Sequence, residues 1–315
     1  MLTFILRRVL QLLPVLILLS ILVFLLVHLV PGDVVDVMMG EGNSDPVVEA
    51  ALRAKYGLDQ SLVMQYFMWM QHVVTGDLGT SIATKEPVIN MITARFPATL
   101  LLAASSAVIA ILIAIPAGIV AALFRNTVID FMAMGSALVG ISVPNFWVGI
   151  LLVLVFSQML GLLPSMGYAS PLDHPGEALR YLVMPALTLG LAMSANITRL
   201  VRAEMIEQMG REYVRTARAK GAPERVVIGF HVLKNAMIPT VTLIGLQIGA
   251  LLEGAVITET IFAWPGLGKL AVSAVLERDY PLIQGIVLAL AVLYIFVNLV
   301  VDMSYRVFDP RVKLG

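Results

Sequence analysis

The feature of this sequence that most limits its fold is a series of long stretches that contain no charged residue. Crossing roughly 30 Å of hydrocarbon, at about 1.5 Å per helical residue, requires about 20 apolar residues in a row. Because a bilayer leaves no water for exposed backbone groups, such stretches are expected to form helices. They lie at residues 9–30, 98–124, 131–163, 182–198, 236–252 and 281–301.

The composition agrees with an all-α membrane protein and excludes several other classes. Only 13% of the 315 residues are charged, against about 25% in a soluble domain, which excludes a water-soluble enzyme. The 21 basic residues are balanced by 21 acidic ones, so nothing favours nucleic acid. With no cysteine and four scattered histidines, we expect no disulfide, metal centre or thiol nucleophile.

Orientation and the number of spans follow from the basic residues. The stretch 131–163 is too long for one upright helix and too short for two, and Pro144 interrupts it. Counting it as one tilted or kinked helix, followed by a loop near Pro164, gives six spans. With both termini in the cytoplasm, the basic-rich loop 199–235 then lies inside, as the positive-inside rule requires. The first span follows Arg7-Arg8 and is expected to be retained, because its apolar run is longer than that of a cleaved signal.

Three regions are therefore expected: a first span at 1–30, an extracytoplasmic insertion at 31–97 and a core domain at 98–315. Within the insertion, Pro46 is expected to start a helix that Gly57 ends. A second helix places aromatic and apolar side chains on one face for packing, and Pro87 starts a short third helix. That face carries Leu62, Tyr66, Trp69 and Val73.

The loop 199–235 contains a predicted short helix with two different faces. One face is cationic and carries Arg211, Arg215 and Arg218. Another has mostly small side chains and carries Tyr213, Ala217 and Gly221. Small side chains let a partner approach the backbone closely, so this helix suits docking on a cytoplasmic protein. A positive loop that only touches lipid headgroups explains the charges equally well.

Several motifs, in order along the chain, resemble permease subunits of binding-protein-dependent ABC importers, specifically the dipeptide, oligopeptide and nickel family. The loop contributes Tyr213-Val-Arg-Thr-Ala-Arg-Ala-Lys-Gly221 and His231-Val-Leu-Lys-Asn235-Ala-Met-Ile-Pro239. The others are Pro31-Gly32-Asp33, Gly57-Leu-Asp-Gln60, Gly76-Asp-Leu-Gly79, Ser142-Val-Pro-Asn-Phe-Trp147, Glu259-Thr-Ile-Phe-Ala-Trp-Pro-Gly-Leu-Gly268, Arg278-Asp-Tyr-Pro281 and Asp309-Pro-Arg311. The early first span and Pro-Gly-Asp loop resemble the first of the two permeases in such systems.

This resemblance implies a type I importer permease that forms half of a transport pathway in a bacterial or archaeal inner membrane. It implies a second homologous permease, two cytoplasmic ATPases and an extracytoplasmic binding protein as partners. The ATPases would dock on a coupling helix that contains Tyr213, Arg215, Ala217, Arg218 and Gly221. Peptides are the implied substrate, with glutathione and nickel as alternatives.

ATP and magnesium are expected in the partner subunits, because Gly266-Leu-Gly268-Lys269 lacks the serine or threonine of a phosphate-binding loop. Glu253 and Glu259, at the outer end of the fifth span, are candidate gate or pathway residues, because buried charges are expensive in a membrane. An interfacial pair with Lys269 or Arg278 is the structural alternative. The motifs Ala114-x-x-x-Gly118-x-x-x-Ala122 and Gly245-x-x-x-Gly249 favour close helix packing.

The sequence lacks the features expected of two other functional classes. An ion-coupled secondary transporter should show acidic ion sites at midspan, yet the middles of the six stretches contain no Asp, Glu, Lys or Arg. An intramembrane enzyme should show paired aspartates, a serine-histidine pair or a metal site within the spans, and none is present. No catalytic residue is therefore expected.

Overall fold

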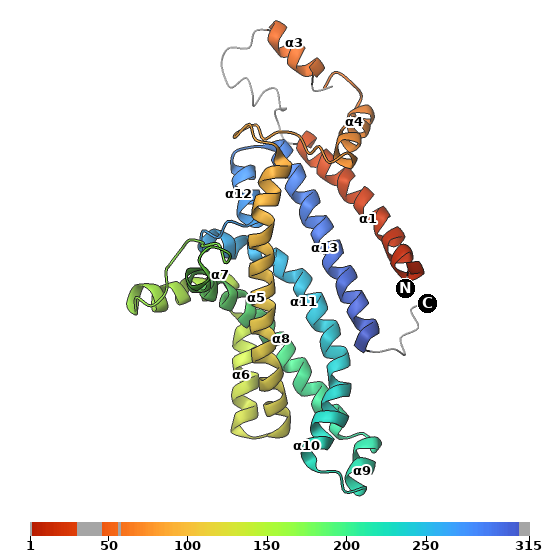
Figure 1. Cartoon of the computed structure of the whole chain (residues 1–315), viewed down its shortest axis with the longest axis vertical. Helices are drawn as coiled ribbons and strands as arrows, with labels where there is room; N and C mark the ends of the chain where they lie inside the picture. Colours follow the sequence, from red (N-terminus) through yellow and green to blue (C-terminus); the bar gives the residue numbers. More distant parts are fainter. Residues whose placement is uncertain (1, 30–45, 56–57, 309–315) are drawn as a thin grey trace. The chain divides into compact units, whose positions relative to one another are not determined.

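The computed structural model describes residues 2–29, 46–55 and 58–308 of the chain (Figure 1). The described part is helical, apart from one isolated β-bridge between Thr80 and Pro87. It divides into two compact units. Unit 1 comprises Met1–Pro97 with Gly266–Ile295, and unit 2 comprises Ala98–Pro265 with Phe296–Gly315. The segment 266–295 thus packs with the N-terminal part of the chain, although the sequence suggested boundaries only at 30 and 97.

Each of the six apolar stretches lies in a helix or in a bent helix pair. Four described helices are long and apolar enough to cross a membrane, and the bent pair is a fifth candidate. The four are α5 (Val88–Leu123), α8 (Pro175–Met209), the run Glu224–Leu251 and Tyr280–Val300 of α13 (Tyr280–Phe308). The first stretch lies in α1 (Leu2–Leu29). The predicted all-α membrane architecture is confirmed.

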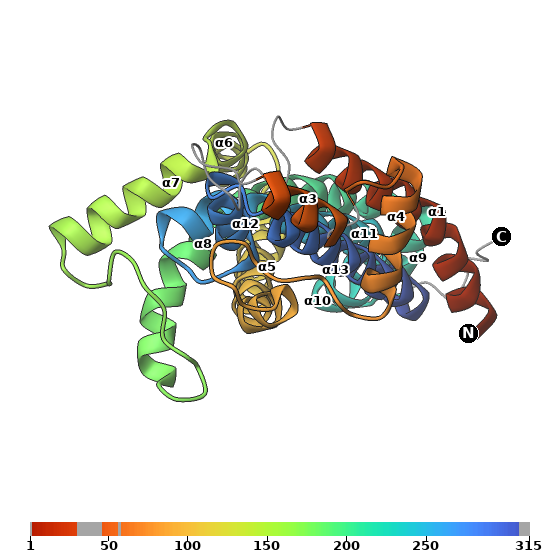
Figure 2. The same ribbon diagram turned by 90° about the horizontal axis from the view of Figure 1, so that it is seen from above.

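The prediction of one tilted or kinked helix for residues 131–163 is wrong. The helix α6 (Val128–Ser142) ends before Pro144, and α7 (Asn145–Leu152) leaves at an angle of 104° to it. The reason is local: a residue before proline avoids the helical conformation, and Val143 is extended with ψ 127°. The π-helical segment η1 (Val153–Met159) continues α7, which points away from α6 in Figure 2.

In unit 1, the insertion is held to the first helix by aromatic side chains. On α4 (Leu62–Val74), the Tyr66 hydroxyl lies 2.8 Å from the Ser20 hydroxyl of α1. The Phe24 ring lies 5.5 Å from the Tyr66 ring and 5.8 Å from the Trp69 ring. The aromatic stripe is therefore a packing face, as predicted.

The other predicted insertion helices are only partly as expected. The first is α3 (Pro46–Lys55), and Gly57 lies outside the described residues. The expected short helix after Pro87 is instead the start of α5, which runs as one helix of 36 residues. This part of α5 packs against α12 (Leu267–Leu276) and α13. Their shared core contains Val88, Ile92, Leu267, Leu270, Ala274, Leu282 and Ile286.

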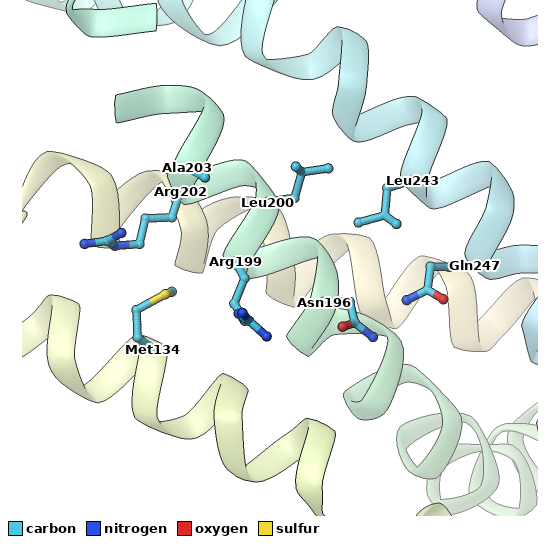
Figure 3. A pocket seen from close by; sticks show the side chains of 8 residues that line it. All are labelled: Met134, Asn196, Arg199, Leu200, Arg202, Ala203, Leu243 and Gln247. Carbon is cyan, nitrogen blue, oxygen red and sulfur yellow. The ribbon is translucent and has the colours of Figure 1, made fainter. Parts of the chain in front are cut away.

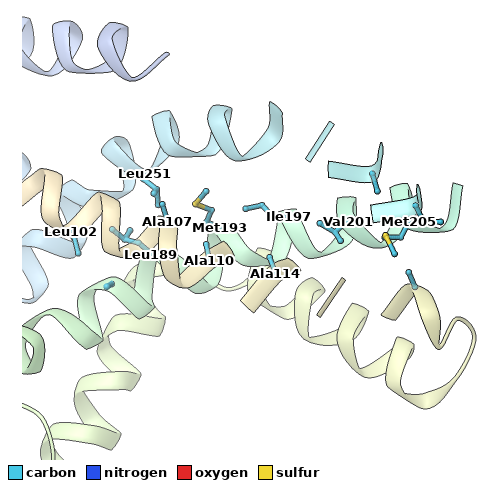
Figure 4. Close-up of a cluster of buried hydrophobic side chains, with 14 of the residues drawn as sticks. Leu102, Ala107, Ala110, Ala114, Leu189, Met193, Ile197, Val201, Met205 and Leu251 are labelled. Atoms are coloured by element: carbon cyan, nitrogen blue, oxygen red, sulfur yellow. The ribbon is translucent and has the colours of Figure 1, made fainter. Parts of the chain in front are cut away.

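In unit 2, α8 is the central helix. It packs against α6, α7 and α11 (Leu233–Ile261), and Figure 4 shows its apolar side chains between those of α5 and α11. The core includes Leu102, Ala107, Ala110 and Ala114 of α5, Leu189, Met193, Ile197, Val201 and Met205 of α8, and Leu251 of α11.

Small residues allow α5 and α8 to approach closely. A Cβ atom added to Gly118 of α5 would lie 2.6 Å from the Val201 Cβ of α8. One added to Gly190 of α8 would lie 2.9 Å from the Ser106 carbonyl oxygen of α5. Because Ala114 and Ala122 are also buried, this small-residue motif serves packing within the chain.

Candidate functional site

A groove of about 620 Å³ lies in unit 2, between α6, α8 and α11 (Figure 3). In Figure 3 the α8 side chains lie between Met134 of α6 and Leu243 and Gln247 of α11. A smaller cavity of about 180 Å³ shares Asn196 and Gln247 with it. We call the two together the polar groove. The larger cavity is lined by Met134, Asn196, Arg199, Leu200, Arg202, Ala203, Leu243 and Gln247, and the smaller one adds Asn145, Leu189, Ala192, Met193, Ala250, Leu251 and Gly254.

Helical periodicity explains why these residues share one surface. On α8, Asn196, Arg199 and Ala203 are spaced by three and four residues, so they lie on one face of the helix. On α11, Leu243, Gln247 and Ala250 follow the same spacing. Asn196 and Arg199 of α8 and Gln247 of α11 therefore lie among apolar side chains on these two helix faces.

One of the two groove arginines is neutralised within the chain. The Arg202 guanidinium donates from Nε to Asp130 Oδ1 at 2.5 Å and from Nη2 to Asp130 Oδ2 at 2.6 Å. The Asn126 backbone N–H donates to the same carboxylate at 3.0 Å. Asp130 is only 2% exposed, so this pair fastens the start of α6 to α8. Arg199, by contrast, is exposed and has no ion-pair partner among the described side chains.

The predicted coupling helix is present as α9 (Glu212–Ala219). Gly221 ends it in the left-handed region, with φ 78°, and the Ala222 N–H donates to the Ala217 carbonyl at 3.2 Å. Helix α9 follows α8 directly, and α10 (Glu224–Val226) and the π-helical η2 (Val227–Val232) then lead into α11. This coupling segment, residues 210–232, therefore connects the two helices that contribute most of the polar groove.

The structure reassigns the faces of α9. Ala217 is buried with Val214 in the core of unit 2, so the face with small side chains packs inward and offers no surface at Ala217. The Tyr213 hydroxyl donates to Gln208 Oε1 of α8 at 2.8 Å and accepts from Asn235 Nδ2 of α11 at 3.3 Å. Tyr213 thus bridges both helices. The exposed residues of α9 and its C-terminal cap are Glu212, Tyr213, Arg215, Thr216, Arg218, Ala219 and Lys220.

Acidic neighbours offset the cationic stripe. Arg215 Nη1 donates to Glu212 Oε1 at 2.8 Å, and Arg218 Nε donates to Glu224 Oε1 at 2.7 Å. Arg211 pairs with Glu207. The hydrogen bond that Arg218 donates to the Glu224 carboxylate raises the pKa of the Arg218 guanidinium above its ordinary value. A docking surface here is consequently a pattern of paired charges rather than a positive patch.

Of the two candidate gate residues, the structure describes the side chain of Glu259 alone, and Glu259 does not line the polar groove. The side chain of Glu253 lies outside the described residues. Glu259 is fully buried in unit 2, where its Oε1 accepts a hydrogen bond from the Thr99 hydroxyl at 2.8 Å. A pathway role for either glutamate stays a prediction.

Glu259→Leu is expected to lower the free energy of unfolding by roughly 1–3 kcal/mol, because the Thr99 hydroxyl loses this buried acceptor. Glu259→Gln keeps an acceptor oxygen and should unfold near the wild-type temperature in detergent, and normal uptake by this variant would make the role of Glu259 structural. Uptake lost selectively in Glu259→Gln, at wild-type stability and expression, would instead assign the carboxylate to the gate.

Comparison with known proteins places the chain in a family. Residues 114–314 match the family described as binding-protein-dependent transport system inner membrane component. Residues 1–103 match the N-terminal part of such membrane components. The chain belongs to this family. It is a membrane-spanning permease subunit of an ABC transporter, which leaves the secondary-transporter alternative without support.

Characterised relatives and a solved structure agree with this assignment. The dipeptide transport system permease of Escherichia coli K12 is 41% identical, with 99% of both chains covered. The glutathione transport system permease of Escherichia coli O6:H1 is 42% identical, again over 99% of both chains. An inward-facing structure of the MetNI methionine ABC transporter matches with a TM-score of 0.58 at 15% identity, covering 70% of this chain and 96% of that one. The permease therefore has the type I importer fold.

Sequence reasoning missed the polar groove because it searched the spans for full charges alone. Asn196 and Gln247 are amides within otherwise apolar stretches, and Asn145 directly follows Pro144. Uncharged hydrogen-bonding side chains at those positions were the available signal. Among the described residues, no group of three or more acidic, histidine or cysteine side chains is placed to hold a metal ion.

Proposed function

We propose that this permease forms half of the translocation pathway of an ATP-driven importer that carries di- or oligopeptides across the inner membrane. Two relatives similar over nearly the whole chain are named for a dipeptide and for glutathione, itself a peptide, which supports peptides as the substrate class. In this proposal a second homologous permease supplies the other half. An extracytoplasmic binding protein delivers the peptide, and the termini and the coupling segment lie in the cytoplasm.

The observation that carries the proposal is the direct connection between the coupling segment and the polar groove. Two cytoplasmic ATPases, which bind ATP and magnesium, dock on the exposed face of α9. Their closure moves α9, and Tyr213 passes that movement to Gln208 of α8 and Asn235 of α11. Since these two helices line the groove, their movement changes its access. Alternating access follows when ATP binding and release favour two different arrangements.

Ala219→Arg tests the docking face of α9. Ala219 is exposed, so the larger side chain is accommodated in the permease but obstructs a protein seated on α9. In proteoliposomes that contain the complete importer, we expect about a tenfold loss of binding-protein-stimulated ATPase activity and of peptide uptake.

The matched control is Ala83→Arg, which places the same side chain at an exposed position of unit 1, far from α9 in the sequence. It should leave both activities at the wild-type level. Full stimulation and uptake by a stable Ala219→Arg complex would show that α9 is not the ATPase contact.

A further inference from the structure

We propose that the polar groove binds the free carboxylate of the transported peptide at Arg199, with Asn196 and Gln247 as neutral partners for the peptide backbone. The inference rests on the proposed function and adds the chemistry by which this chain recognises its substrate. All three side chains line the larger cavity, and Asn196 and Gln247 also line the smaller one.

The charge of Arg199 has no counter-charge in the described groove. The residues that line the described groove include Arg199 and Arg202 and no acidic side chain. Asp130 neutralises Arg202 through two hydrogen bonds, whereas Arg199 has no such partner in the described part of the chain. The positive charge of Arg199 is therefore unmatched by any acidic side chain among the described residues that line the groove. Beside the apolar side chains of the same groove, such a cation is stabilised by water or by an anion.

Arg199, Asn196 and Gln247 carry hydrogen-bonding groups that complement those of a peptide. A guanidinium presents a planar fork of N–H donors that fits the two oxygens of a carboxylate. Asn196 is three residues before Arg199 on the same face of α8, and Gln247 faces it from α11 (Figure 3). Each amide offers both a donor and an acceptor, which matches the N–H and C=O of a peptide bond. Neutral amides hold a peptide backbone without selecting its side chains.

The same residues disfavour a free divalent metal as the ligand of this groove. Nickel prefers imidazole, thiolate or carboxylate ligands, and none of these lines the two described cavities. A guanidinium repels a cation. The volume of about 620 Å³ is ample for a short peptide. The groove thus favours peptides over nickel among the substrates expected for this family.

The absence of cysteine from the whole sequence allows a direct measurement of charge in the groove. Ala203→Cys places one thiol at an exposed lining position. In the complete importer, reconstituted in phosphatidylcholine vesicles, an anionic and a cationic methanethiosulfonate reagent are compared by the mass shift of this chain. The anionic reagent should be favoured, and adding Arg199→Gln should lower the anionic-to-cationic rate ratio roughly fivefold.

Protection of the same thiol identifies the group that Arg199 binds. Alanyl-alanine should slow modification of the thiol introduced by Ala203→Cys. The concentration required should be about tenfold lower than that of alanyl-alanine amide, which lacks the carboxylate. Arg199→Gln should remove this difference. Arg199→Lys keeps the charge without the fork, so it should retain the reagent preference and lose most of the discrimination. Arg180→Gln removes an exposed arginine of α8 outside the groove. The Ala203→Cys protein that also carries Arg180→Gln should show the same reagent preference and the same discrimination as the protein with Ala203→Cys alone.

The outcomes separate this inference from the proposed function. Equal protection of the thiol by alanyl-alanine and by its amide overturns the carboxylate site at Arg199. Protection of the thiol that appears only when phosphatidylglycerol is added to the vesicles also overturns this site, because the groove then holds a lipid phosphate. If alanyl-alanine is taken up equally well by Arg199→Gln and protects nothing, the inference fails while the importer assignment stands. If the wild-type complex protects selectively but imports no peptide, the carboxylate site stands and the proposed function fails.

Discussion

Asp130→Ala is expected to be among the most destabilising single changes in unit 2, by about 3–5 kcal/mol. The carboxylate that it removes is 2% exposed and receives two hydrogen bonds from Arg202 and one from the Asn126 backbone. Without it, a largely buried guanidinium loses its counter-charge, and α6 loses its polar attachment to α8. The free energy of unfolding in detergent, followed by heat or denaturant, measures the effect.

A double-mutant cycle separates the ion pair from other contributions. Arg202→Ala should also destabilise, and the double variant should be less destabilised than the sum of the two single variants. Glu212→Ala is the control, because it breaks the exposed pair with Arg215 and exposed pairs contribute little. Equal stability of Asp130→Ala and Glu212→Ala would show that the buried pair does not hold α6 to α8.

Gly118→Ala is the second change with a large expected effect. Its new Cβ would lie 2.6 Å from the Val201 Cβ and 2.9 Å from the Thr198 carbonyl oxygen, so α5 and α8 must move apart. Overpacking of this kind costs about 1–3 kcal/mol for one methyl group, and Gly118→Leu should abolish the native packing. The yield of monodisperse protein and its unfolding temperature report the loss.

The matched control is Gly135→Ala in α6, where nothing lies within 4 Å of the added Cβ. It should leave the stability unchanged or slightly raised, because alanine is the better helix former. Val201→Ala should rescue Gly118→Ala only slightly, because it removes the Val201 Cγ1 at 2.7 Å but leaves the Val201 Cβ and the Thr198 carbonyl. An unfolding temperature for Gly118→Ala equal to that of Gly135→Ala would contradict the close approach of α5 and α8.

The spans were predictable from the sequence because a charged side chain in hydrocarbon is so unfavourable that uncharged length alone identifies them. The bend at Pro144 was predictable only as an interruption. Proline excludes the helical conformation for Val143, but the direction of α7 depends on its packing against α8 and α11. The extension of α5 through residues 88–97 likewise depends on its contacts with Leu267 and Leu282 in unit 1.

The short helix in the loop 199–235 was located correctly in the sequence, yet its inward face was not. Spacing shows which residues share a face, and the partner of that face is set by tertiary packing. Val214 and Ala217, three residues apart, were the apolar signal that this face is buried. Arg199 was counted only as a basic loop residue, because its place beside Asn196 and Gln247 depends on how α8 and α11 meet.

The π-helical segment η2 takes up an extra residue in front of α11. A π turn accommodates one residue more than an α turn, and each residue of an α-helix turns the chain by about 100°. Removing one residue from Val227–Val232 would therefore restore a regular helix and leave the later side chains of α11 facing nearly the same way. Removing one residue between Leu233 and Gln247, where the helix is regular, would instead rotate Gln247 by about 100°, away from the groove. A change of length in the chain after α9 is thus tolerated at η2 and not within α11.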